Sequence, residues 1–163
     1  MSDSDFRARA VLMGKGNRYE DMVPGRTFDH HWGRTITDGD NAAFTTQTLS
    51  FCPLYFNAPY AQSLGHPGTV VNPLLVFNLV FGLSVEDLSE GGGPFLGVDD
   101  CRFHKAVYPG DTLTARSTVE DARESRGQPG FGIVRWHTEG FNQHGDRVLE
   151  FRRTNLVRRR GGE

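Results

Sequence analysis

Large apolar residues gather in one stretch near the middle of the chain. Between Pro73 and Glu90 they surround almost the whole circumference of a helix: Leu74, Leu75, Val76, Phe77, Leu79, Val80, Phe81 and Leu83. A helix of this kind is typically buried on all sides. Proline suits its first turn, and the glycines at 91–93 end it. We therefore predict one buried helix from Pro73 to Glu90, around which the other elements are arranged.

Two shorter helices are predicted before this stretch. Thr37 is a suitable N-cap, because two aspartates follow it where carboxylates meet the positive end of the helix dipole, and the helix is expected to run to about Thr48. A second helix, from Ala58 to Leu64, ends at Gly65, a residue typical of helix C-termini. The residues from Arg26 to Ile36 are expected to be extended.

The pattern changes to strands after the glycines. Polar and apolar residues alternate over 112–119, and turn sequences bound three further extended segments, at 95–107, 132–141 and 147–157. We expect three or four long antiparallel strands that follow the helices. The arginines at 158–160 are predicted to form a solvated tail beyond the last strand.

Length and composition favour one ordinary domain. The 163 residues suffice to bury a core, and 37% of them are hydrophobic, including 12 phenylalanines. The formal net charge of -2 argues against a nucleic-acid partner. We expect a flexible segment over residues 1–18 and a single domain over residues 19–163.

The cysteines and histidines suggest neither a disulfide framework nor a metal site. Cys52 and Cys101 form no CxxC pair, so both are predicted to be free thiols in a reducing, cytoplasmic compartment. Cys52 has no histidine or cation near it in the sequence, which favours a buried, unreactive thiol. The six histidines lack the spacings of zinc ligands, so no metal is expected. No apolar stretch is long enough to cross a bilayer.

The loop from Ser50 to Asn57 is the candidate functional segment. It places a hydroxyl, a thiol, a phenol and an amide within eight residues, between apolar neighbours. These groups either form an active site or satisfy backbone groups of an irregular loop. Asn72, just before Pro73, also has two interpretations: it is a candidate active-site residue and a suitable N-cap of the helix that starts at Pro73.

The order of these elements resembles the hot-dog fold, an α+β architecture in which an antiparallel sheet wraps a long central helix. Short motifs also resemble the MaoC-like (R)-specific enoyl-CoA hydratases and dehydratases: Tyr19-Glu-Asp, Gly33-Arg-Thr-Ile-Thr-Asp38, Pro53-Leu54, Ala58 to Ala61 and Pro109-Gly-Asp-Thr-Leu113. The resemblance implies acyl thioesters of coenzyme A or acyl carrier protein as substrates. It also implies a homodimer or a higher homo-oligomer, and no cofactor besides the coenzyme A of the substrate.

The sequence departs from the family pattern at the residues that carry its chemistry. The family uses a carboxylate and an imidazole in a motif like Gly-Asp-x-Asn-Pro-Leu-His as a general acid-base pair. Aligned on Pro53-Leu54, this chain has Ser50 in place of the aspartate and Tyr55 in place of the histidine. Pro73 occupies the place of a glycine whose N–H polarises the thioester carbonyl, and proline has no N–H.

Loss of both shuttling groups should impair hydration more than hydrolysis, because a thioester carbonyl is already electrophilic. We therefore predict a thioesterase that acts on an acyl-CoA through hydrogen bonds and a positioned water. The alternatives are a divergent hydratase or dehydratase with acid-base groups elsewhere in the fold, and a non-catalytic protein that binds acyl thioesters. The candidate catalytic residues are Tyr55, Asn57, Asn72 and Ser50. The candidate substrate-binding residues are Cys52, Phe56 and Val71, with Arg102, Lys105 and Arg126 for the phosphates of coenzyme A.

Overall fold

The computed structural model describes residues 16–161. Most of the segment that was expected to be flexible lies outside these residues. The helical elements are η1 (Tyr19–Asp21), α2 (Asp38–Gln47), η2 (Pro53–Tyr55), α3 (Ala58–Ser63), α4 (Pro73–Leu83) and α5 (Val85–Leu88). The strands are β1 (Thr27–Asp29), β2 (Arg34–Thr35), β3 (Phe95–Phe103), β4 (Thr112–Glu124), β5 (Phe131–Phe141) and β6 (Arg147–Arg158).

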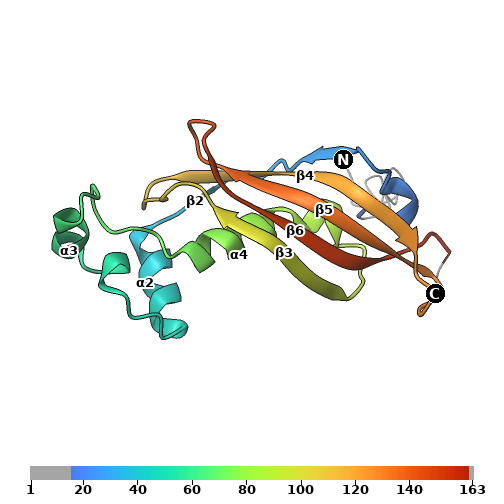
Figure 1. The fold of residues 1–163 in the computed structure, drawn as a ribbon, viewed down its shortest axis with the longest axis horizontal. Coiled ribbons are helices and arrows are strands. Elements are labelled where there is room, and N and C mark those ends of the chain that lie inside the picture. Colours follow the sequence, from blue (N-terminus) through green and yellow to red (C-terminus); the bar gives the residue numbers. More distant parts are fainter. Residues whose placement is uncertain (1–15, 162–163) are drawn as a thin grey trace, which may run out of the picture.

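The strands form one antiparallel sheet in the order β1-β4-β5-β6-β3, and β2 pairs with the start of β4. Helix α4 lies along one face of this sheet, while α2 and α3 project beyond one end (Figure 1). The middle of the sheet consists of three long strands that follow one another in the sequence, β4, β5 and β6. Strand β3 is an outer strand. The predicted α+β hot-dog architecture is confirmed.

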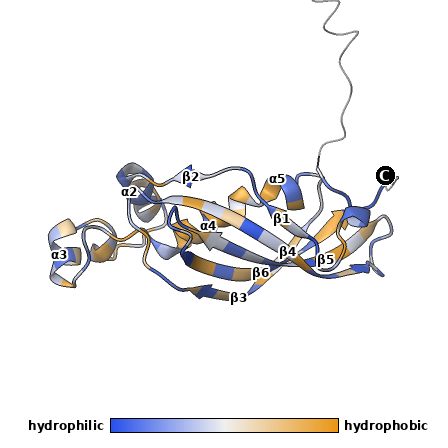
Figure 2. Cartoon of the chain, turned by 90° about the horizontal axis from the view of Figure 1, so that it is seen from above, coloured by the Kyte–Doolittle hydropathy of each residue, from blue (hydrophilic) through white to orange (hydrophobic). Residues whose placement is uncertain are grey.

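The core forms two clusters, one between α4 and the sheet and one in which Leu88 of α5 packs against the sheet. Polar and apolar residues alternate along the strands (Figure 2), most regularly in β5, where the inward-facing Val134 and Trp136 are fully buried. Val80 of α4 and Phe151 of β6 are also fully buried and belong to one cluster. Burying a side chain of this size contributes about 1.5–3 kcal/mol, so the packing of α4 against the sheet fixes the position of this helix.

The helix predicted from Pro73 to Glu90 is interrupted. Helix α4 ends at Leu83, and α5 begins at Val85. The Ser84 hydroxyl donates to the Phe81 carbonyl at 2.7 Å and accepts from Arg153 at 3.0 Å, so the residue between the helices is held by contacts outside the helical ladder.

The prediction that this helix is buried on all sides is also wrong. Leu74 is 54% exposed, and Phe77 and Phe81 are only partly buried. The sheet covers one side of α4, and the described residues include no second layer over the other. The prediction rested on the apolar residues around the helix, and these residues do not show whether other elements cover every side of it.

The shorter helices agree with the sequence. Thr37 caps α2 by accepting from the Asp40 N–H at 3.1 Å, and the Asp40 carboxylate accepts from the Thr37 N–H at 2.8 Å. These reciprocal bonds form a capping box. Helix α3 is followed by Gly65, whose φ of +89° is readily adopted by glycine.

The arginines at 158–160 do not form the predicted solvated tail. Arg158 belongs to β6, Arg159 pairs with Glu124 at 2.7 Å, and Arg160 pairs with Asp21. The carboxylates come from the end of β4 and from η1. The sequence did not indicate that these elements meet the end of β6.

Candidate active site

A buried asparagine joins the candidate loop to the start of α4. Asn41 of α2 is 1% exposed, and its side-chain amide donates to the carbonyls of Tyr55 at 2.8 Å and Val70 at 2.9 Å. Its side-chain oxygen accepts from the Asn72 N–H at 2.9 Å. One side chain thus fixes three segments that surround the candidate site. Sequence analysis missed this residue, and an asparagine inside a helix was its only signal.

Two of the candidate catalytic residues are hydrogen-bonded to each other. The Asn72 amide donates to the Ser50 hydroxyl at 3.2 Å, and its oxygen accepts from the Leu74 N–H at 3.0 Å. Asn72 is therefore the N-cap of α4, which was one of its two interpretations. Within residues 16–161, one N–H of the amide has no acceptor, so Asn72 orients the loop and keeps one donor for a ligand.

A cavity of about 290 Å³ lies between the loop, the first turns of α4 and the segment that follows β3. This size is near the lower limit for small-molecule sites, about 300 Å³. Its lining consists of Leu54, Tyr55, Val70, Val71, Pro73, Val76 and residues 103–107. Burial, with a smaller contribution from Cys52, raises the pKa of Tyr55. The phenol therefore stays protonated at neutral pH and can donate a hydrogen bond, but it is a poor base.

The remaining candidates from the loop point elsewhere. The exposed Asn57 caps α3, because its side-chain oxygen accepts from the Tyr60 N–H at 3.1 Å. Cys52 and Phe56 are exposed, so the prediction that Cys52 is buried is wrong. Proline at 53 begins η2 directly after Cys52, which leaves that thiol on the outside of the turn.

The basic residues proposed for the phosphates of coenzyme A do not form one group. Lys105 lines the cavity and pairs with Asp146 at 2.6 Å. Arg102 is exposed on the outer strand β3. Arg126 lies in the turn between β4 and β5, at the end of the sheet opposite α3 (Figure 1). The structure therefore places Lys105, and not Arg126, beside the candidate site.

An imidazole and a carboxylate meet at the cavity outside the loop. His104 lines the cavity, and its Nε2 lies 3.2 Å from Oε1 of Glu150. Burial acts to raise the pKa of Glu150, but the hydrogen bond from His137 and the charge of Arg147 outweigh it, so this pKa is lowered. An ionised carboxylate fixes the orientation and tautomer of the imidazole that it contacts. His104 and Glu150 are 46 residues apart, so only the fold reveals the pair.

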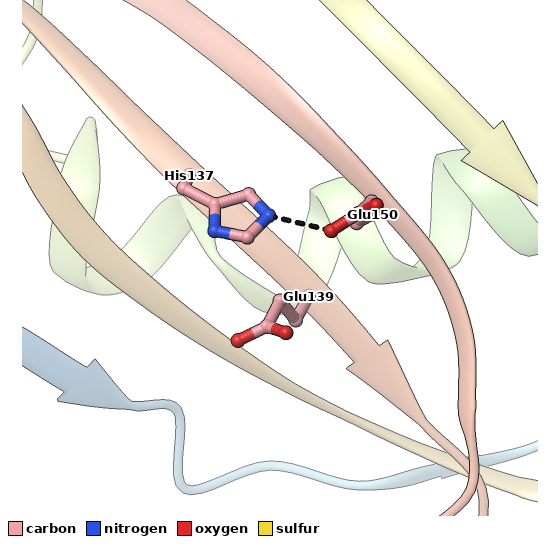
Figure 3. Close-up of side chains that lie close together, drawn as sticks. All are labelled: His137, Glu139 and Glu150. Atoms are coloured by element: carbon pink, nitrogen blue, oxygen red, sulfur yellow. Dashed lines mark hydrogen bonds and ion pairs between the residues drawn. The ribbon is translucent and has the colours of Figure 1, made fainter.

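Glu150 also belongs to the cluster that offers the best set of metal ligands in residues 16–161. Side chains of His137, Glu139 and Glu150 converge on the face of the sheet away from α4 (Figure 3). Arg147 Nη1 lies 2.9 Å from Glu139 and 3.1 Å from Glu150, so a cation of the chain already compensates both carboxylates. This arrangement is explained as an ion-pair network, and the absence of a metal stays a prediction.

A second histidine–carboxylate pair serves the fold. His30 is buried, with Nδ1 at 2.6 Å from Asp87 and Nε2 at 2.9 Å from the Ser117 hydroxyl. Both ring nitrogens are thus occupied, and the pair ties β1 to α5 and β4. Elsewhere, none of the helices within residues 16–161 has the length and apolar character needed to cross a bilayer.

A sheet wrapped around α4, with a cavity at the first turn of that helix, places the chain among the hot-dog proteins of the MaoC-like class. A MaoC-domain protein dehydratase from Chloroflexus aurantiacus superposes with a TM-score of 0.86 and 40% identity, over 93% of this chain and 43% of that one. A Mycobacterium tuberculosis protein with a double hot-dog fold gives a TM-score of 0.78 and 25% identity, over 88% and 44% of the two chains.

Sequence comparisons define the family. Residues 4–162 match the family model for mesaconyl-CoA hydratase, and the chain belongs to this family. It is 39% identical to the mesaconyl-CoA hydratase of Haloarcula hispanica, over 93% of this chain and 43% of the relative. It is 41% identical to the beta-methylmalyl-CoA dehydratase of Chloroflexus aurantiacus, over 89% and 41%. The chain thus spans less than half the length of these curated relatives.

These relatives overturn the predicted thioesterase. Mesaconyl-CoA hydratase and beta-methylmalyl-CoA dehydratase are hydro-lyases and not thioester hydrolases. The prediction rested on the loop, where Ser50 and Tyr55 replace the two titratable groups of the family, and it kept a hydratase with acid-base groups elsewhere in the fold only as an alternative.

Proposed function

We propose that the chain acts as a hydro-lyase on a coenzyme A thioester, adding water to, or removing it from, a short acyl group of the mesaconyl-CoA type. The observation that carries this proposal is the shared cavity of Tyr55 and His104, with Glu150 behind the imidazole. The names of the relatives support the substrate class. Addition of water changes no overall oxidation state, so the proposed reaction needs no redox cofactor.

In the proposed mechanism, the protonated phenol of Tyr55 donates a hydrogen bond to the thioester carbonyl oxygen. Polarising this carbonyl draws electrons from the double bond and makes the β-carbon electrophilic. Glu150 accepts the Nε2 proton of His104, which leaves Nδ1 to take a proton from water as the water oxygen bonds to the β-carbon. A proton then returns to the α-carbon, and dehydration follows the same steps in reverse.

The first experiment measures hydration of mesaconyl-CoA by loss of the enoyl-thioester absorbance, beside an assay for released thiol. We expect hydration without thiol release. His104→Gln should lower kcat/KM by about 10²–10⁴-fold, the range of a general acid-base group. Tyr55→Phe should lower kcat by about 10²–10³-fold, as expected for one carbonyl-binding donor.

His144→Gln is the matched control, because His144 is an exposed histidine in the turn between β5 and β6. Its activity should equal that of the wild type. Full activity of His104→Gln would refute the assignment of the imidazole, and thiol release without hydration would refute the hydro-lyase proposal itself.

The length of the relatives supports a second candidate function. Because this chain corresponds to less than half of each, it can act as a thioester-binding unit whose acid-base groups lie in a second hot-dog unit. Tight binding of a non-reactive acyl-CoA by the wild-type chain, with no turnover of mesaconyl-CoA, would favour this alternative over the first.

We also propose that a second copy of this chain covers the uncovered side of α4. Leu74 is 54% exposed, and the outer strand β3 exposes Leu96 and Phe103 by 50% and 44%. A solved relative of about twice the length contains two hot-dog units, which shows that one such unit can sit beside another in a single assembly. An outer strand with exposed apolar side chains is a typical pairing surface.

Sedimentation should therefore give about twice the mass of one chain. Leu96→Lys should shift the protein toward the monomer, because a charge on an outer strand opposes edge-to-edge pairing. Val23→Lys, at a site that is 58% exposed outside this surface, should leave the mass unchanged. A wild-type monomer at all concentrations would contradict the proposal.

A further inference from the structure

Arg153 of β6 is a buried cation that the proposed mechanism does not use. It is 1% exposed and faces the helix side of the sheet. Its guanidinium donates to Asn155 Oδ1 at 2.8 Å, Ser84 Oγ at 3.0 Å and Ser89 Oγ at 2.6 Å. All three acceptors are neutral. A guanidinium carries five N–H groups, so two N–H groups have no acceptor within residues 16–161.

No carboxylate within residues 16–161 forms an ion pair with Arg153. Its other contacts are aromatic: the guanidinium carbon lies 4.1 Å from the ring centroid of Phe81 and 5.8 Å from that of Trp136. Burial lowers the pKa of Arg153 to about 10, so the side chain still carries its charge at neutral pH. An uncompensated buried charge is costly, and proteins usually provide a partner for it.

The guanidinium lines a second cavity, of about 380 Å³, that is otherwise mainly aromatic and aliphatic. Its lining consists of Phe77, Asn78, Phe81, Val85, Ser89, Gly93, Phe95, Arg153 and Asn155. Phe81 and Phe95 meet edge to face at 5.4 Å, which gives the wall a fixed shape. Apolar walls that converge on a few polar groups are typical of small-molecule sites.

This cavity is separate from the one at Tyr55. The two linings share no residue: the first cavity includes Pro73 and Val76 of α4, and the second includes Phe77, Asn78 and Phe81 of the same helix. Tyr55 and Arg153 thus belong to two different cavities.

We propose that this second cavity binds an apolar organic acid, with its carboxylate on Arg153 and its hydrocarbon part against Phe77, Phe81 and Phe95. The planar guanidinium matches a carboxylate, and a charge-assisted pair is stronger than a neutral hydrogen bond. The serine hydroxyls hold the guanidinium in place without neutralising it, so its charge remains available to the ligand.

The test compares hexanoate with hexan-1-ol, which has the same chain length but no charge, using thermal unfolding and calorimetric titration of the full chain. Hexanoate should raise Tm in a concentration-dependent way and bind more tightly than hexanol. Arg153→Met should weaken hexanoate binding by about 10–100-fold, as expected for hydrogen bonds to a charged group, and leave hexanol binding within about 3-fold. Equal binding of hexanoate and hexanol to the wild type would overturn the proposal.

Ser89→Asp provides a second variant that keeps the arginine. Ser89 Oγ lies 2.6 Å from Nη2 of Arg153, so an aspartate there supplies an internal carboxylate. This variant should unfold at or above the wild-type Tm and lose hexanoate binding. Retained binding would contradict the site.

Arg152→Met is the matched control, because Arg152 is the next residue on β6, faces the other side of the sheet and pairs with Glu120. It should bind hexanoate like the wild type. If hexanoate does not bind and Arg153→Met instead abolishes self-association, a carboxylate of a second copy occupies the cavity and the proposal is wrong.

Discussion

Asn41→Ala is expected to lower the free energy of unfolding by about 3–5 kcal/mol, the largest loss from any single polar side chain around the candidate site. The variant removes two donors and one acceptor at once. The carbonyls of Tyr55 and Val70 and the N–H of Asn72 then lose their partner inside the protein. Each buried polar group left unpaired costs about 1–3 kcal/mol, and partial access of water near Tyr55 keeps the total below the maximum.

Urea unfolding followed by circular dichroism measures this loss. Asn78→Ala is the matched control, because Asn78 is also a helical asparagine but is exposed, so its cost should stay below about 0.5 kcal/mol. Asn41→Asp should also be strongly destabilising, because it keeps the acceptor for Asn72 but turns a negative charge toward two carbonyl oxygens. A cost for Asn41→Ala no greater than that of the control would mean that the loop and α4 hold their places without this residue.

The same experiment tests how the cavity is built. Tyr55 reaches the cavity only if the loop keeps its position against the first turn of α4, and the Asn41 amide makes the direct connection. Those molecules of Asn41→Ala that remain folded should therefore lose catalytic activity, even though Asn41 lines no part of the cavity. A folded variant with full activity would show that Tyr55 is positioned by the 3₁₀ turn alone.

Local signals in the sequence were sufficient for most of the secondary structure. The capping residue Thr37, the stop at Gly65 and the entry of α4 at Pro73 are each determined by neighbours in sequence, and the structure has them as predicted. The alternation over 112–119, in β4, is equally local, because it needs only one buried face. The break at Ser84 was missed, and the contact that Ser84 makes with Arg153 joins residues 69 apart in the sequence.

The candidate site was only partly accessible to sequence reasoning for the same reason. The loop and Asn72 stood out because their polar groups are close together in the chain. His104, Glu150 and Asn41 did not stand out, because each of them contacts residues that are distant in the sequence. The prediction of hydrolysis was wrong because it rested on one loop, and a missing motif there says nothing about groups that the fold brings together from distant positions, such as His104 and Glu150.

Gly93→Ala should have the second-largest effect, with a loss of about 3 kcal/mol or more and a distorted cavity at Arg153. Gly93 has a φ of +143°, which side chains other than glycine rarely adopt. A Cβ at this position would also lie directly against the carbonyl oxygen of Leu156, well inside contact distance. The next residue, Pro94, accepts the Leu156 N–H at 2.9 Å, so any shift of the backbone disturbs the pairing between β3 and β6.

Gly92→Ala separates these two causes. Gly92 also has a positive φ, +85°, but a Cβ there meets nothing within 4 Å, so its cost should be about 1–2 kcal/mol. Thermal and urea unfolding of the two variants then give the cost of the close approach as a difference. Because Gly93 lines the cavity and Gly92 does not, only Gly93→Ala should also weaken hexanoate binding. Equal losses of stability in the two variants would show that the approach to Leu156 relaxes freely, and that the start of β3 is more adaptable than its contacts indicate.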